Sequence, residues 1–245
     1  WENTVRNQNI AGILPDIVWT NSPDYYFLID SKIGLNLTPY ITASEAEGDF
    51  NFKEDFYTEY FDMGAKDGKQ YCIPRSCDSV VTFYNKEVLA NANISLDGIE
   101  NGWTWDTFMG KLAEYRAYLD KNGKTSWYCL DMNLYNWLSV NYPILRSYGA
   151  DIINKNLDIT VDSPEVREAL GLVREMVDKR YIPYPGSDCG NSFEAGTGPF
   201  LFQSAAPSVY DTAILKGKFD VVSFPLINKY SMPKIGCGIA GYAIN

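Results

Sequence analysis

Pro15-Asp16-Ile17-Val18-Trp19, followed at once by Thr20-Asn21-Ser22-Pro23-Asp24, is the stretch that decides the fold. The first segment is a short apolar run, which is typical of a buried strand. In the second, Asn21 or Ser22 can cap a helix that begins at Pro23, because proline lacks only a donor that would be unpaired there. The stretch therefore predicts a strand, a polar loop and a helix. In open α/β sheets such loops are where ligands bind.

The same alternation continues along the chain. Apolar residues at helical spacing predict a helix that Thr104 caps and that ends at Asn122-Gly123. A second helix is predicted to begin at Asp162-Ser163-Pro164-Glu165, where Asp162 and Glu165 can cap each other reciprocally, with an apolar stripe formed by Val166, Ala169, Leu170, Val173 and Val177. Asp67-Gly68 predicts a tight hairpin turn, and β-branched or aromatic runs predict strands at 79–84, 220–224 and 235–244. Strands that alternate with helices favour parallel α/β layers.

The amino-acid composition excludes several classes of function. The 245 residues are 46% hydrophobic, which is enough for one large core or two smaller ones. With 21 basic and 31 acidic residues, the chain carries a net charge of -10 and is expected to bind neither nucleic acid nor anionic lipid. It contains no histidine, which excludes Ser-His-Asp catalysis and HExxH zinc sites. No run of about 18 apolar residues predicts a membrane span.

Five cysteines are spread along the chain without a CxxC motif: Cys72, Cys77, Cys129, Cys189 and Cys237. This spacing argues against a zinc cluster. Free buried thiols are the expectation, with one disulfide in an oxidising compartment as the alternative.

Aromatic residues are abundant, with 18 Tyr and 6 Trp, and several fall in predicted loops or at helix starts. An aromatic face covers the apolar side of a sugar ring while carboxylates and amides bind its hydroxyls. Trp105 and Trp127 are instead assigned to packing. Asp24 near Trp19 and Asp78 near Tyr84 leave open a second interpretation, since paired carboxylates can form the acid and nucleophile of a glycoside hydrolase.

The order of these segments resembles family 1 of the bacterial extracellular solute-binding proteins, the carbohydrate receptors of ABC importers. The resemblance runs from Ile10 to Asn245 and rests on residues 10–19, 35–41, 68–74, 83–86, 103–106, 162–170 and 236–245. It implies an α/β, two-lobed, periplasmic-binding-protein-like fold with mixed sheets flanked by helices and a hinge. Lobe 1 would comprise residues 1–77, lobe 2 residues 78–236, and residues 237–245 the second crossing back to lobe 1.

The resemblance also assigns roles to residues. Sugar contacts would come from Trp19, Asn21, Asp24, Asp78, Tyr135 and Trp137, with Tyr210 near a segment where the family carries another stacking aromatic. Trp19 is expected to stack on the sugar, and Asp78 to accept hydrogen bonds from its hydroxyls. The hinge would comprise Cys77, Ser79, Gly236 and Gly238, with the glycines at positive φ absorbing the rotation of closure.

The implied receptor has no catalytic residue, cofactor or metal. It would bind a sugar or oligosaccharide, act as a monomer with the membrane permease subunits of an ABC importer, and be held outside the cell by a lipidated N-terminal cysteine. That cysteine, the family's opening strand and a helical C-terminal section are missing from the sequence, so we expect a fragment. A peptide or polyamine receptor on the same scaffold is the remaining alternative.

Overall fold

The computed structural model describes residues 1–21, 24–97, 102–132, 138–154, 156–184, 186–187, 191–204, 215–228, 231–232 and 234–245. The chain divides into two compact units. Unit 1 contains Trp1–Asp78 and Cys237–Asn245, and unit 2 contains Ser79–Gly236. The division after Asp78 lies one residue later than the sequence-based boundary. The chain therefore passes between the units twice, once leaving unit 1 after Asp78 and once returning at Cys237.

Unit 1 is built on strands that come from distant parts of the chain. Its sheet has the order β1 (Ile17–Asn21), β8 (Cys237–Ile244) and β4 (Cys72–Asn85). β1 is antiparallel to β8, with Ile17 opposite Ile244 and Asn21 opposite Ala240. The helices of the unit are α1 (Glu2–Ile10), α2 (Asp24–Asp30), α3 (Thr38–Glu47), α4 (Phe52–Asp55) and α5 (Thr58–Asp62).

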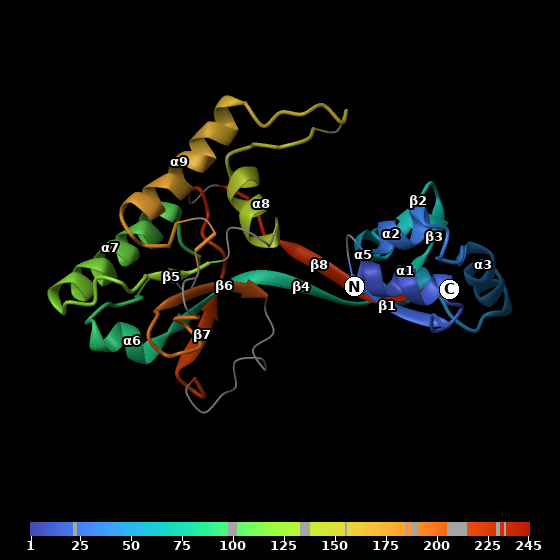
Figure 1. Cartoon of the computed structure of the whole chain (residues 1–245), viewed down its shortest axis with the longest axis horizontal. Coiled ribbons are helices and arrows are strands. Elements are labelled where there is room, and N and C mark those ends of the chain that lie inside the picture. The colour runs from blue at the N-terminus through green and yellow to red at the C-terminus, as the bar shows by residue number, and fades with distance from the viewer. Residues whose placement is uncertain are drawn as a thin grey trace. The chain divides into compact units, whose positions relative to one another are not determined.

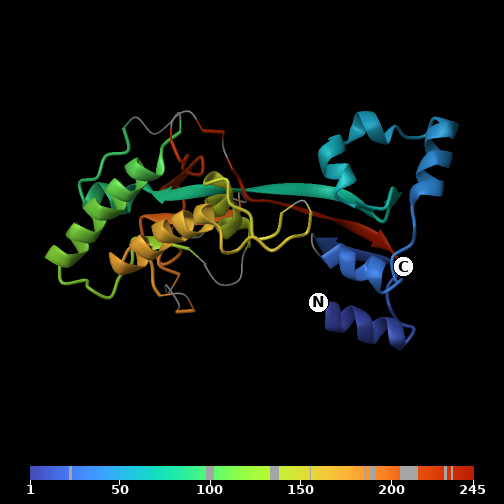
Figure 2. The same cartoon turned by 90° about the horizontal axis from the view of Figure 1, so that it is seen from above.

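The core of unit 1 lies between this sheet and the helices α1 and α2. One cluster of buried side chains comprises Val5, Val18, Leu28, Ile33 and Ala243, and a second comprises Tyr25, Cys72 and Ile239. Since Val18 and Thr20 are buried and Ile17 and Trp19 are exposed, only one face of β1 contributes to the core. Figure 2 shows β4 and β8 running in opposite directions.

The hairpin of unit 1 confirms the prediction made from Asp67-Gly68. β2 (Ala65–Lys66) and β3 (Lys69–Gln70) pair in antiparallel register. The turn residues have φ angles of 52° for Asp67 and 72° for Gly68, as a type I′ turn requires.

Unit 2 combines the second half of β4 with β5 (Leu130–Asp131), β6 (Phe200–Ser204) and β7 (Phe219–Val222). Around these strands lie α6 (Lys86–Asn91), α7 (Trp105–Lys121), α8 (Leu138–Ser147) and α9 (Pro164–Asp178) (Figure 1). The core is rich in aromatic side chains, including Trp103, Trp105, Phe108, Phe200, Phe202 and Phe224. Trp105 is buried against Phe108, Phe202 and Phe224, which confirms its assignment to packing.

The strand pairing differs from the parallel layers that the alternating elements favour. β4 pairs antiparallel with both β6 and β7, and β5 with β6 is the one parallel pair among the described registers. β4 pairs with strands more than a hundred residues away rather than with its next neighbour in sequence, so the local alternation of strands and helices does not set the direction of these pairs.

The N-cap residues of α7 and α9 can be compared with the predictions. Thr104 caps α7 as predicted, accepting a hydrogen bond from the Thr107 N–H. At α9 the cap is Ser163, which accepts from the Val166 N–H, whereas the predicted cap Asp162 pairs with Arg167. Proline at the first helical position makes the residue just before it the N-cap.

The predicted face of α9 needs correction. Leu170 is 52% exposed and Met176 is buried, so the buried stripe runs through Val166, Ala169 and Met176. Trp127 packs against the core of unit 2, which confirms its assignment to packing, although it lies in irregular structure and not in a strand. Within the described part of the chain, no helix is both long and apolar enough to cross a membrane.

Candidate functional site

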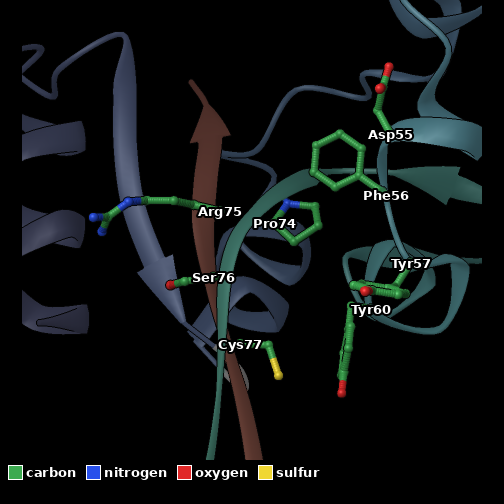
Figure 3. Close-up of a pocket in the computed structure, with 8 residues that line it drawn as sticks. All are labelled: Asp55, Phe56, Tyr57, Tyr60, Pro74, Arg75, Ser76 and Cys77. Carbon is green, nitrogen blue, oxygen red and sulfur yellow. The ribbon is translucent and has the colours of Figure 1, made fainter. Parts of the chain in front are cut away.

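A groove in unit 1 has the features of a small-molecule site. It is lined by Asp55, Phe56, Tyr57, Tyr60, Pro74, Arg75, Ser76 and Cys77 (Figure 3). Its volume of about 440 Å³ lies within the range of about 300–1,000 Å³ that ligand pockets occupy. One wall comes from the end of α4 and from α5, and the other from the first half of β4.

The α4–α5 wall presents aromatic faces to the groove. Tyr57 and Tyr60 meet edge to face, with ring centroids 6.1 Å apart and an interplanar angle of 89°. Phe56, which also lines the groove, stacks on Phe52 at 5.9 Å and contacts Phe61 at 5.4 Å, and these contacts hold the segment in place. Tyr57 is 78% exposed, so most of its ring is available to a ligand.

The β4 wall divides its side chains between two directions. Figure 3 shows Pro74 and Cys77 on the side of Tyr60, while Arg75 and Ser76 extend to the other side of the strand. The side of β4 that carries Pro74 and Cys77 therefore faces the aromatic wall, as in pockets lined mainly by apolar and aromatic side chains.

At one end of the groove, polar groups from β4 and β8 meet. The Sγ atoms of Cys77 and Cys237 lie 3.2 Å apart, and the Asp78 carboxylate accepts a hydrogen bond of 3.2 Å from the Gly238 N–H. A hydrogen bond between the Tyr60 hydroxyl and Cys77, together with the charges of Cys77 and Cys237, raises the pKa of Tyr60 to about 12. The Tyr60 proton is therefore held in the hydrogen bond to Cys77, and the hydroxyl oxygen is left to accept.

Gly238 was expected to supply freedom at positive φ during closure, and this stays a prediction. In the conformation seen here its φ lies outside the left-handed region, and a Cβ atom at this position would stand 3.1 Å from Asp78 Oδ1. A side chain at position 238 would require the Asp78 carboxylate to shift by a few tenths of an ångström.

The structure places three further predicted residues on β1 and α2. Trp19, which is 45% exposed, lies in the middle of β1 opposite Tyr242 of β8, rather than at the strand's carboxyl end. Asn21 is the last residue of β1. Asp24 begins α2, and partial burial, with a smaller contribution from nearby Glu2, raises the pKa of its carboxyl although the N-terminal ammonium opposes the shift.

Trp19 and Asp78 are not brought together. Trp19 lies opposite residue 242 of β8 and Asp78 contacts residue 238, four residues earlier. Four residues of strand span about 13 Å, at about 3.3 Å per residue, and β8 separates β1 from β4. Tyr135, Trp137 and Tyr210 lie outside the described residues.

The sequence analysis missed the groove tyrosines. Tyr57 and Tyr60 belong to an acidic and aromatic segment, and their spacing of three residues on a short helix was the available signal. Among the described residues, no three His, Cys, Asp or Glu side chains gather into a metal site.

Comparison with known proteins assigns the chain to a family. Residues 1–243 match the family described as bacterial extracellular solute-binding protein. The chain belongs to this family. The resemblance inferred from the sequence motifs is thereby confirmed.

Relatives of this solute-binding protein include sugar receptors. Over 124 residues it is 25% identical to an arabinooligosaccharide-binding protein of Halalkalibacterium halodurans, a match that covers 51% of this chain and 26% of that protein. A putative binding protein of Brucella abortus is 27% identical over 168 residues, or 61% of this chain and 38% of that protein. The matched segments thus cover well under half the length of these relatives.

Solved structures share the fold at low sequence identity. An ABC substrate-binding protein of Listeria monocytogenes in complex with cycloalternan gives a TM-score of 0.77 at 22% identity, covering 99% of this chain and 60% of that one. UgpB of Mycobacterium tuberculosis, in complex with glycerophosphocholine, gives 0.79 at 17% identity over 99% of this chain and 58% of that one. The fold of the solute-binding protein is that of the two-lobed α/β periplasmic binding proteins, as predicted.

Proposed function

We propose that this solute-binding protein captures a carbohydrate for an ABC importer and that the groove of unit 1 forms one wall of the sugar site. The observation that carries the proposal is the pair Tyr57 and Tyr60, which stand edge to face at a groove of about 440 Å³. The proposal is supported by the relatives and structural neighbours that are named for sugars.

The chemistry of the groove suits a sugar ring. The Tyr57 face, largely exposed, can cover the apolar C–H side of a pyranose. The Tyr60 hydroxyl oxygen can accept a hydrogen bond from a sugar hydroxyl while its proton is donated to Cys77. The Asp55 carboxylate, which also lines the groove, can accept hydrogen bonds from sugar hydroxyl groups, and a charged acceptor strengthens such bonds.

The residues proposed from sequence complete this site. We keep Asn21, Asp24 and Asp78 as contributors from unit 1, and Tyr135, Trp137 and Tyr210 as contributors from the rest of the chain. Because Trp19 lies about 13 Å from the Asp78 contact along β8, the two would serve different units of an oligosaccharide.

The cellular setting follows from the family. We propose an extracellular monomer, lipid-anchored, that delivers its sugar to permease subunits and catalyses no reaction. The two passages of the chain between the units, at residues 78–79 and 236–237, would serve as the hinge.

Isothermal titration calorimetry with a ligand panel tests the proposal. The panel contains maltooligosaccharides, arabinooligosaccharides, glycerophosphocholine, oligopeptides and polyamines, and each sample is analysed for products. We expect saturable binding of a sugar without turnover. Hydrolysis of any glycoside would favour the two-carboxylate enzyme, whereas binding restricted to peptides or polyamines would favour the third alternative.

A further inference from the structure

We propose that Cys77 and Cys237 are a redox-active thiol pair that forms a disulfide by exchange with a small-molecule disulfide. The two residues lie 160 positions apart in the sequence, one on β4 and one on β8. This inference is independent of the ligand that the groove binds.

The distance between the sulfurs supports bond formation. Cys77 Sγ and Cys237 Sγ are 3.2 Å apart, and a disulfide bond of about 2.05 Å requires an approach of only about 1 Å more. Both side chains project from strands that are hydrogen-bonded neighbours in the sheet.

The surroundings separate this pair from the other described thiols. Cys77 is exposed and Cys237 is partly exposed, so a disulfide in solution can reach them. Cys72 and Cys129 are buried, and burial raises the pKa of the Cys72 thiol to about 11 and that of Cys129 to about 12. Because these two thiols are buried, a disulfide in solution does not reach them, and they serve as internal controls.

The environment also assigns an order to the two sulfurs. Partial burial raises the pKa of Cys237 to about 12, and the hydrogen bond with Cys77 and the nearby Asp78 carboxylate add to the shift, while the Tyr60 hydroxyl opposes it. Cys77, the more exposed sulfur, is the residue that attacks first. Cys237 then acts as the resolving thiol.

The exchange with oxidised glutathione takes place in two steps. The Cys77 thiolate attacks one sulfur of oxidised glutathione, forming a mixed disulfide and releasing one glutathione thiolate. The Cys237 thiolate then attacks Cys77 Sγ and releases the second glutathione thiolate. The two protons lost by the protein thiols are taken up by the two glutathione thiolates, so the protein is oxidised by two electrons and oxidised glutathione is reduced to two thiols.

The bond would join the two points where the chain leaves and re-enters unit 1. It would close a loop of 160 residues that includes all of unit 2. Closing a long loop restricts the unfolded chain, so the oxidised protein should melt at a temperature higher by roughly 5–10 °C.

The test uses the whole chain with Cys189→Ser, because Cys189 lies outside the described residues. The protein is equilibrated in glutathione buffers of graded potential, quenched with acid and N-ethylmaleimide, and digested with trypsin. Cleavage after Arg75, Lys86 and Lys234 isolates Cys77 and Cys237 in peptides 76–86 and 235–245, each with a single cysteine. We expect mass spectrometry to find these peptides linked, with Cys72 and Cys129 alkylated only after unfolding.

Two matched variants complete the experiment. In Cys237→Ser, Cys77 should accumulate the glutathione adduct. In Cys77→Ser, Cys237 should react with oxidised glutathione at least tenfold more slowly than Cys77 does. The melting temperature of each reduced variant reports whether it is folded. Unlinked peptides at every potential, or a glutathione adduct on Cys77 that Cys237 never resolves in the parent, would overturn the proposal. Linkage to Cys72 or Cys129 instead would overturn it equally.

Discussion

Replacing Tyr57 with alanine should weaken sugar binding without weakening the fold. The side chain is 78% exposed and lines the groove, so its ring contributes little to the core and most of one face remains to be covered. A tyrosine buries about 150–250 Å² when fully covered, so one exposed face offers about 60–100 Å² to a ligand. At about 25 cal/mol per Å², this area is worth about 1.5–2.5 kcal/mol.

That free energy corresponds to a Kd increase of about 10- to 60-fold. The assay is calorimetric titration with the sugar that binds the parent most tightly, paired with urea unfolding of both proteins. Tyr57→Phe keeps the ring face and should bind within a few-fold of the parent. Tyr40→Ala is the matched control, since Tyr40 is 62% exposed on α3 and does not line the groove.

The outcome separates two explanations. If Tyr57→Ala binds as tightly as the parent, the aromatic wall is not part of the sugar site and the groove loses its assigned function. If Tyr40→Ala weakens binding as much as Tyr57→Ala does, the effect is not specific to the groove. If Tyr57→Ala and Tyr40→Ala lose the same free energy of unfolding, Tyr57 contributes more to the stability of the fold than its exposed fraction indicates.

Other variants probe the rest of the molecule. Asp78→Ala and Trp19→Ala should each raise the Kd for an oligosaccharide at least about tenfold in the same titration. Unchanged Kd values for these two variants would show that the motif-based assignment of the site is wrong. Trp105→Ala should instead lower the melting temperature of the protein, because it leaves a cavity in the core. Gly238→Val places a Cβ near Asp78 Oδ1 and should weaken binding while far-UV circular dichroism stays unchanged, and a lost helical signal would instead indicate misfolding. Arg116→Met removes the hydrogen bonds that a buried guanidinium donates to the Trp127 and Lys124 carbonyls. Urea unfolding should show that the free energy of unfolding falls by about 2–4 kcal/mol. A fall below about 0.5 kcal/mol would contradict a stabilising role for these hydrogen bonds.

Several elements could be predicted from sequence because they depend on interactions between residues that are close together in the chain. The cap of α7 by Thr104 and the turn at Asp67-Gly68 depend on residues within three positions of each other, and both are present as predicted. The burial of Trp105 follows from the apolar spacing of its helix. The family could also be recognised, because its motifs occur in order along the chain.

Competing local signals explain the errors. Asp162 and Ser163 can both cap a helix, and the position of Pro164 decides between them. Leu170 lies at the edge of the α9 stripe, where spacing alone does not distinguish a buried from an exposed side chain.

The sequence by itself determined the class of the elements, their order and the family, because these depend on short-range periodicity, capping and motif spacing. Only the tertiary structure decided which strands pair, that the sheet is mainly antiparallel, and that β8 lies between β1 and β4. The groove tyrosines and the contact between Cys77 and Cys237 depend on those pairings. No local pattern specifies contacts between residues 160 positions apart, because strand register is set by the packing of the whole sheet.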